Sequence, residues 1–278
     1  MENTESPLKN FRRQPKIYIS LPSQGKYYKD NIIANNTFTE IPVFSMTASD
    51  EILYKTPDAM ITGNATSANI KSCIPSVLDP WNIITLDIDT LLIGIRMATY
   101  GDSMTVDHKC SCGESNSYEI NLNKYLEYYQ NCKFIDSLKI DDFTFRIKPL
   151  TYRKWTEVQK KTVTLQRAIN TQVTKIDDEN EKMKALDNIT LQINDLAIST
   201  IFDYVESIEV GGEIETNKNE IIDFMANQDL TYFKQIKEVV EKNIETWAMP
   251  GEKVVCNACK KNNNIRIGMD TSDFFGLG

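Results

Sequence analysis

Residues 108–113, His108-Lys109-Cys110-Ser111-Cys112-Gly113 (HKCSCG), hold two cysteines that are one residue apart. Such a pair can present two thiolates from one short turn, but a structural zinc ion takes four protein ligands. A second pair lies near the other end of the chain, in Cys256-Asn257-Ala258-Cys259 (CNAC). If the two pairs share one metal ion, the fold has to bring these distant segments together.

The sequences that flank the two cysteine pairs follow the same pattern. Apolar and polar residues alternate in residues 104–108 and 118–122 around the first pair. Two valines precede the second pair, and alternation resumes at residues 265–269. Because a period of two is typical of β-strands, each pair is predicted at the tip of a β-hairpin. Two such hairpins form a zinc ribbon, in which a structural Zn²⁺ is bound by a four-cysteine set. The predicted ligands are Cys110, Cys112, Cys256 and Cys259.

Other interpretations of these residues stay open at the level of the sequence. The four cysteines can be unligated small residues in hairpin turns. His108 can replace Cys110 as a ligand, because the H-x-x-x-C spacing also reaches a common metal. Cys73 and Cys132 stand apart from both pairs and are expected to be ordinary core or boundary residues.

Composition narrows the class of protein. The chain has 278 residues, of which 41% are hydrophobic and 25% charged, and its net charge of −8 disfavours general nucleic-acid binding. The polar N-terminus does not resemble a signal peptide, and no apolar run approaches the roughly 20 residues that span a bilayer. The expected compartment is therefore a reducing cytoplasm, where paired cysteines more often bind metal than form disulfides.

The predicted fold class is α+β, with a mixed N-terminal domain whose four-cysteine zinc ribbon is interrupted by a long, mainly helical insertion. Four segments follow from this pattern. They are an N-terminal arm (1–16), an α+β domain with the first zinc knuckle (17–132), a mainly helical insertion with β-hairpins (133–250), and the second knuckle with a C-terminal tail (251–278).

Helix signals appear in both of the larger segments. Thr47-x-x-Asp50 predicts an N-cap and a helix through about Tyr54, and Pro57 predicts the first turn of the next helix. Asp87 or Asp89 is expected to cap the helix that carries Leu91, Leu92, Ile95 and Met97. In residues 151–206, apolar residues recur every three to four positions and so form an apolar stripe along one face of a helix. This pattern predicts two antiparallel helices that bury their apolar stripes against each other. The stripes are Trp155, Val158, Thr162, Leu165 and Ile169, then Leu186, Ile189, Ile193, Ile198 and Ile201.

Two short segments have alternative interpretations. Residues 21–28 (LPSQGKYY) join a Pro-Gly turn to two tyrosines, which can pack on their own domain or face a partner protein. Residues 273–278 (DFFGLG) form an apolar tail, which can dock on its own ribbon or insert into a neighbouring molecule.

Catalytic patterns are missing from the sequence. A chain with one histidine has no H-E-x-x-H motif, and no Gly-rich phosphate loop is present. Four cysteines would also close the coordination shell that a catalytic zinc keeps open for water. We therefore expect a non-enzymatic protein whose metal is structural.

Several phrases, taken in order, resemble a known phage family. They are LPSQGKYY (21–28), MTASDEILYKTPDAMITG (46–63), LLIGIRMATYG (91–101), the first knuckle with EINL (119–122), and CNAC with DFFGLG. The chain is similar to the baseplate hub assembly protein family of T-even-type (T4-like) contractile-tailed phages. One departure is that the first knuckle, C-S-C-G, is one residue shorter than the C-P-x-C-G of the family.

The resemblance implies a late protein that helps to build the baseplate hub, as an assembly factor or chaperone or as a hub subunit. Its implied partners are hub and tape-measure proteins, and its implied location is the host cytoplasm during tail assembly, with the virion as a further option. Two other functions remain. Lys253, Lys260, Lys261 and Arg266 around the second knuckle favour a zinc-ribbon nucleic-acid-binding module, and the paired cysteines resemble the zinc centre of a redox-switched chaperone.

Overall fold

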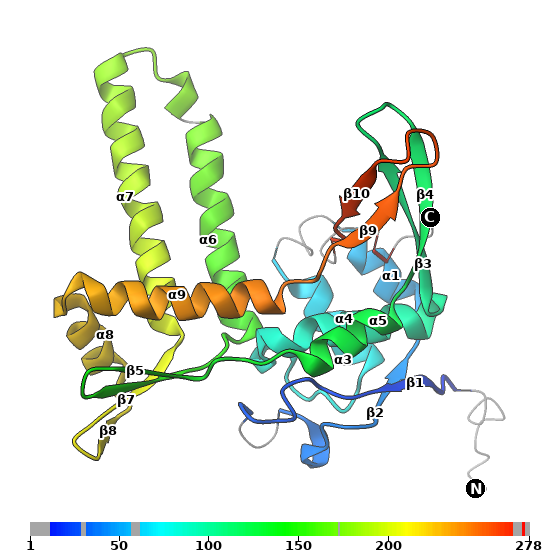
Figure 1. Cartoon of the computed structure of the whole chain (residues 1–278), viewed down its shortest axis with the longest axis horizontal. Coiled ribbons are helices and arrows are strands. Elements are labelled where there is room, and N and C mark those ends of the chain that lie inside the picture. The colour runs from blue at the N-terminus through cyan, green and yellow to red at the C-terminus, as the bar shows by residue number, and fades with distance from the viewer. Residues whose placement is uncertain (1–11, 29–31, 57–61, 172, 269–273, 276–278) are drawn as a thin grey trace, which may run out of the picture. The chain divides into compact units, whose positions relative to one another are not determined.

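Helices and antiparallel strands alternate along the chain, which confirms the predicted α+β class (Figure 1). This computed structural model describes residues 12–28, 32–56, 62–171, 173–268 and 274–275. Most of the predicted arm and the predicted helix start at Pro57 lie outside these residues. The chain divides into two compact units, Met1–Asn131 with Met249–Gly278 (unit 1) and Cys132–Ala248 (unit 2). No helix in the described residues is long and apolar enough to cross a membrane.

Unit 1 combines three two-stranded antiparallel sheets with four α-helices, counted over the described residues. Its paired strands are β1 (Pro15–Ile19) with β2 (Ile41–Phe44), β3 (Ser103–Lys109) with β4 (Ser115–Asn121), and β9 (Glu252–Val255) with β10 (Asn262–Ile265). Its helices are α1 (Ala48–Tyr54), α3 (Asn64–Cys73), α4 (Thr85–Tyr100) and α5 (Asn123–Asn131), with short 3₁₀ turns at η2 (Ala34–Asn36) and η3 (Pro80–Asn82).

Helix α4 forms the centre of unit 1, and most of its side chains are buried. Gly94 lets the helix approach the β1–β2 sheet, because a Cβ at this position would lie 3.1 Å from Ile19 Cδ1. The predicted capping box of α1 is confirmed: Thr47 and Asp50 each bind the other's backbone N–H. The close approach at Gly94 packs α4 against the first sheet.

The predicted cap of α4 was wrong. The helix begins at Thr85, two residues before Asp87, and its N-cap residue Ile84 provides no side-chain cap. Asp87 is instead fully buried, and its oxygens accept hydrogen bonds from Ser23 N (3.0 Å), Ser23 Oγ (2.6 Å) and Tyr28 Oη (2.7 Å). Burial raises the pKa of Asp87, and the bonds from Ser23 and Tyr28 oppose that rise. Residues 21–28 are thereby anchored on their own domain, and Tyr28 also stacks on Phe38.

Phe274 and Phe275, the described residues of the C-terminal tail, dock on helices of unit 1. Phe274 and Phe275 are each 1% exposed. Arg96 Nη1 donates to Phe274 O (2.7 Å), and Tyr100 Oη donates to Phe275 O (2.9 Å). The Phe275 ring packs on Tyr54 of α1, with the ring centroids 4.3 Å apart. These two residues dock on α1 and α4 of their own unit, so the expectation that the tail docks on the ribbon was wrong for them.

Unit 2 contains a four-stranded antiparallel sheet in the order β5-β6-β7-β8. Its strands are β5 (Ser137–Ile140), β6 (Phe143–Ile147), β7 (Val205–Val210) and β8 (Glu213–Glu215). Its helices are α6 (Tyr152–Thr171), α7 (Glu179–Asp203), α8 (Lys218–Asn227) and α9 (Leu230–Trp247), with a 3₁₀ turn at η4 (Val173–Lys175).

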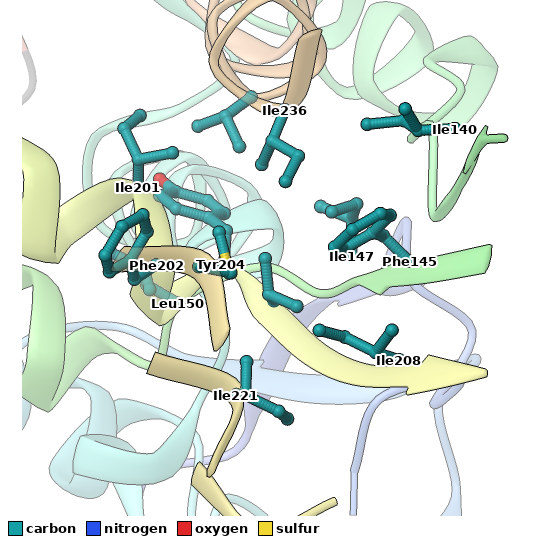
Figure 2. Packing of buried hydrophobic residues seen from close by; sticks show 13 residues of the cluster. Ile140, Phe145, Ile147, Leu150, Ile201, Phe202, Tyr204, Ile208, Ile221 and Ile236 are labelled. Atoms are coloured by element: carbon teal, nitrogen blue, oxygen red, sulfur yellow. The ribbon is translucent and has the colours of Figure 1, made fainter. Parts of the chain in front are cut away.

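One apolar cluster holds unit 2 together (Figure 2). Phe145 and Ile147 of β6, Ile208 of β7 and Ile236 of α9 belong to it, and each is at most 4% exposed. Asn243 of α9 adds a polar anchor: its side chain accepts from Ile135 N and donates to Ile135 O, both at 2.8 Å. This amide satisfies two backbone groups of the segment that leads into β5.

The helical hairpin α6–α7 is confirmed, but the predicted mutual burial of its apolar stripes is only partial, because seven of the ten stripe residues are half-buried. Of the ten stripe residues, only Ile201 is buried, at the base of α7 where the helix meets the core cluster. Ile193 and Ile198 are 37% and 41% exposed. The reason is geometric, because two helices that pack only on each other can cover a single narrow strip.

Candidate metal centre

The two cysteine pairs lie in the turns of two similar hairpins. In the first, Lys109 of β3 pairs with Ser115 of β4, which leaves a five-residue turn. In the second, Val255 of β9 pairs with Asn262 of β10, which leaves a six-residue turn. The C-x-C motif has one residue fewer than C-x-x-C, and the first turn is shorter by that one residue. The difference in length is confined to the turn, so the strands of both hairpins pair without a shift in register.

Both turns close in the same way despite this difference in length. The N–H of the first cysteine donates across the turn, from Cys110 to Glu114 O (2.8 Å) and from Cys256 to Lys261 O (3.0 Å). The carbonyl of each first cysteine then accepts from the residue that follows the second cysteine, Gly113 at 2.9 Å or Lys260 at 3.0 Å. Both of those residues have positive φ, 96° and 59°. The shorter knuckle thus uses a tighter version of the same turn, with glycine where the backbone is left-handed.

The four sulfur atoms come together between the two turns. All lie within 4.8 Å of one another, and the pairs Cys110–Cys259 and Cys112–Cys256 are each 3.7 Å apart. Four sulfurs bound at about 2.3 Å to one tetrahedral ion are separated by about 3.8 Å, whereas a disulfide is about 2.05 Å long. The spacing fits a shared metal ion. In the described part of the chain, no other group of His, Cys, Asp or Glu side chains gathers in this way.

The turns also favour thiolates at the first cysteine of each pair. Backbone N–H donation from Cys112 is the largest of the effects that lower the pKa of Cys110 to about 6. The corresponding N–H of Cys259 lowers the pKa of Cys256. Metal ions bind the deprotonated form, so both effects prepare the cluster for a cation. Cys110 and Cys256 are buried while Cys112 and Cys259 are exposed, so a metal ion can reach the cluster from the side of the two exposed cysteines.

Side chains that carried no signal in the sequence join the two hairpins around the sulfurs. Asn116 Nδ2 lies 3.5 Å from Cys256 Sγ, and its Oδ1 accepts from Asn257 N at 3.0 Å. Asn263 Nδ2 lies 3.6 Å from Cys110 Sγ. Tyr118 Oη donates to Val255 O at 3.1 Å, and Lys261 Nζ donates to Ser111 Oγ at 3.0 Å. The two hairpins are therefore joined to each other by hydrogen bonds that do not involve a metal.

The remaining candidate residues lie outside the cluster. His108 is a half-buried strand residue, paired with Asn116 across β3–β4, and does not belong to the group of four. Cys73 is buried, which raises the pKa of its thiol to about 12. Cys132 is half-buried, with its sulfur 3.4 Å from Thr246 O. The prediction that Cys73 and Cys132 are core or boundary residues is confirmed.

Fold and site together define an α+β protein in which a four-thiol candidate metal centre joins two hairpins from distant parts of the sequence. A family model described as T4 bacteriophage base plate protein matches residues 15–276. The chain therefore belongs to the T4 bacteriophage base plate protein family. Neither a search of curated proteins nor a search of solved structures found a match.

Proposed function

We propose that this baseplate protein acts in building the baseplate hub, as an assembly factor or as a hub subunit, together with the tape-measure protein. The observation that supports this role most directly is the family match over residues 15–276. The resemblance of residues 21–28, 46–63 and 91–101 to hub assembly proteins supports the hub in particular. The role is structural and non-catalytic, and it is carried out in the host cytoplasm during tail assembly.

The second part of the proposal is that Cys110, Cys112, Cys256 and Cys259 bind one structural Zn²⁺. Four soft sulfur ligands at the spacing of a tetrahedron select zinc over the harder cations that prefer oxygen. Such an ion would tie β3–β4 to β9–β10, between which the whole of unit 2 is inserted in the sequence. Its binding free energy would then contribute to the folding of unit 1.

Metal content tests the ligand set. Inductively coupled plasma mass spectrometry measures the zinc content of the purified wild type, of Cys110→Ser and of Cys132→Ser. The proposal expects one zinc per chain in the wild type and in the Cys132→Ser control, and a clear loss in Cys110→Ser. Full retention of zinc in Cys110→Ser would show that Cys110 is not a required ligand.

Composition of the virion and capture from infected cells test the hub role. If the protein is an assembly factor, purified virions lack it, and tagged protein captures hub or tape-measure proteins from cells during tail assembly. If it is a hub subunit, virions contain it in a fixed ratio to other baseplate proteins. Absence from virions together with capture of neither partner contradicts the hub proposal.

One observation favours a second candidate function, nucleic-acid binding by the ribbon. Lys253, Lys260, Lys261 and Arg266 are all exposed around the second knuckle. Against it stands the net charge of −8 for the whole chain. A salt-dependent affinity of the purified protein for DNA or RNA, lost when these four residues are made neutral, would support this function over the hub role.

A further inference from the structure

Two asparagines occupy equivalent positions in the two hairpins and point in opposite directions across the cluster. Asn116 is the second residue of β4, and Asn263 is the second residue of β10. Asn116 of the first hairpin contacts the sulfur of Cys256 in the second. Asn263 of the second hairpin contacts the sulfur of Cys110 in the first. Each hairpin thus brings an amide to the first cysteine of the other.

The two asparagines differ in how strongly they are held. Asn116 is 4% exposed, and both ends of its amide are engaged, because Oδ1 accepts from Asn257 N while Nδ2 faces Cys256 Sγ. Asn263 is half-buried, and its Nδ2 also donates to Lys261 O at 3.2 Å within its own hairpin. Its Oδ1 lies 3.7 Å from Cys110 Sγ, nearly as close as its Nδ2. Asn116 is therefore the better fixed donor.

Asn116 is placed to act on the sulfur in two ways. Donation from Nδ2 withdraws electron density from a thiolate, which stabilises its charge without competing for the metal. Acceptance by Oδ1 fixes the N–H of Asn257, the residue directly after Cys256, and so sets the position of the second turn relative to the first. An amide performs both tasks with one planar group, whereas a side chain that only fills space performs neither.

We propose that Asn116 is the positioning residue that sets the metal affinity of the four-cysteine centre, with Asn263 as its weaker counterpart. This inference rests on the proposed metal site and adds the residues that tune it. Outer-shell partners of metal ligands typically contribute about 10- to 100-fold to affinity. We expect a loss in this range for Asn116→Ala and a smaller loss for Asn263→Ala.

The test replaces zinc with Co²⁺ in the full-length protein and measures metal affinity by competition with a chromophoric chelator. Asn262→Ala is the matched control, because Asn262 is an exposed asparagine of the same strand as Asn263. Its affinity should equal that of the wild type. If the wild type itself binds neither Zn²⁺ nor Co²⁺, the metal centre is refuted. If the wild type binds and Asn116→Ala binds equally well, only the role of Asn116 is refuted.

A second variant separates positioning from folding. Asn116→Asp keeps the shape and the acceptor for Asn257 N but has no donor for Cys256. The sulfur-to-cobalt charge-transfer band should move to lower energy in Asn116→Asp, because a sulfur that has lost a hydrogen bond holds its electrons less tightly. A purely structural role for Asn116 predicts an unchanged band in every variant that folds, as judged by far-UV circular dichroism. An unchanged band in Asn116→Asp overturns the inference even if Asn116→Ala fails to fold.

Discussion

Asp87 provides a quantitative test of how residues 21–28 are anchored. Replacement by alanine removes the acceptor of three hydrogen bonds, from Ser23 N, Ser23 Oγ and Tyr28 Oη. A hydrogen bond to a charged group contributes about 1.5–3 kcal/mol. Because Asp87→Ala also removes the cost of burying a carboxylate, we use the lower value for each bond. The expected loss is then about 4.5 kcal/mol for the local anchoring of this segment.

Hydrogen exchange of peptides covering residues 20–28 measures this loss directly. At about 1.4 kcal/mol for each factor of ten, exchange in Asp87→Ala should be about 10³-fold faster than in the wild type. Tyr28→Phe removes one of the three bonds and should accelerate exchange about tenfold. Ser117→Ala is the control, since Ser117 lies on an exposed strand face of the ribbon. Exchange within threefold of wild type in Asp87→Ala would refute the proposed anchoring.

The pH dependence provides a further check on the same carboxylate. Burial raises the pKa of folded Asp87 above its unfolded value of about 3.9, so the folded state holds the proton more tightly. The part of its stability that comes from this tighter proton binding is therefore complete below the unfolded pKa and is lost as the pH rises through the folded pKa, while the hydrogen bonds from Ser23 and Tyr28 persist. After correction for intrinsic exchange rates, acidification should stabilise the segment in the wild type relative to Asp87→Asn. A difference that does not change with pH would contradict this assignment.

Three further predictions concern other parts of the molecule. Chelation of the proposed zinc should lower the melting temperature and expose the turns of the ribbon to protease, and an unchanged melt with unchanged proteolysis would exclude a structural metal. Asn243→Leu should lower the unfolding free energy of unit 2 by about 2–3 kcal/mol, because Ile135 N and O lose their partner. Urea unfolding followed by the fluorescence of Trp155 and Trp247 measures this loss. An unchanged urea midpoint would contradict the prediction. Phe275→Ala should lower the unfolding free energy of unit 1 by about 3 kcal/mol, since Phe275 is 1% exposed and its ring packs on Tyr54. A loss below about 1 kcal/mol in calorimetric unfolding would show that Phe275 is not part of the core.

Features set by neighbouring residues were predictable from the sequence. The capping box of α1 depends on two residues three positions apart, and both of its hydrogen bonds form. The hairpins around both cysteine pairs follow from alternating residues and short polar turns, which are local signals as well. For the same reason the sequence indicated Cys110, Cys112, Cys256 and Cys259 as one group, and the structure places their sulfurs within 4.8 Å.

Features that depend on what lies across the fold were not predictable in this way. Asp87 has the position of a helix cap in the sequence, but Ser23 and Tyr28, about 60 residues away, make it a buried acceptor. Ile193 and Ile198 follow a helical stripe, yet in the described part of unit 2 they stay 37% and 41% exposed. A periodic pattern shows which face of a helix is apolar, but the number of packed layers decides whether that face is buried.

The amino-acid sequence by itself determined the local elements, the four-cysteine group and the resemblance to baseplate proteins. Only the tertiary structure showed how a C-x-C turn can match a C-x-x-C turn, and that Asn116 and Asn263 reach across to the opposite cysteines. Turns and caps are determined by hydrogen bonds between residues that are close in the sequence, so a short stretch of sequence is enough to predict them. The surroundings of a sulfur atom are decided by which strands the fold brings beside it, and no local pattern carries that information.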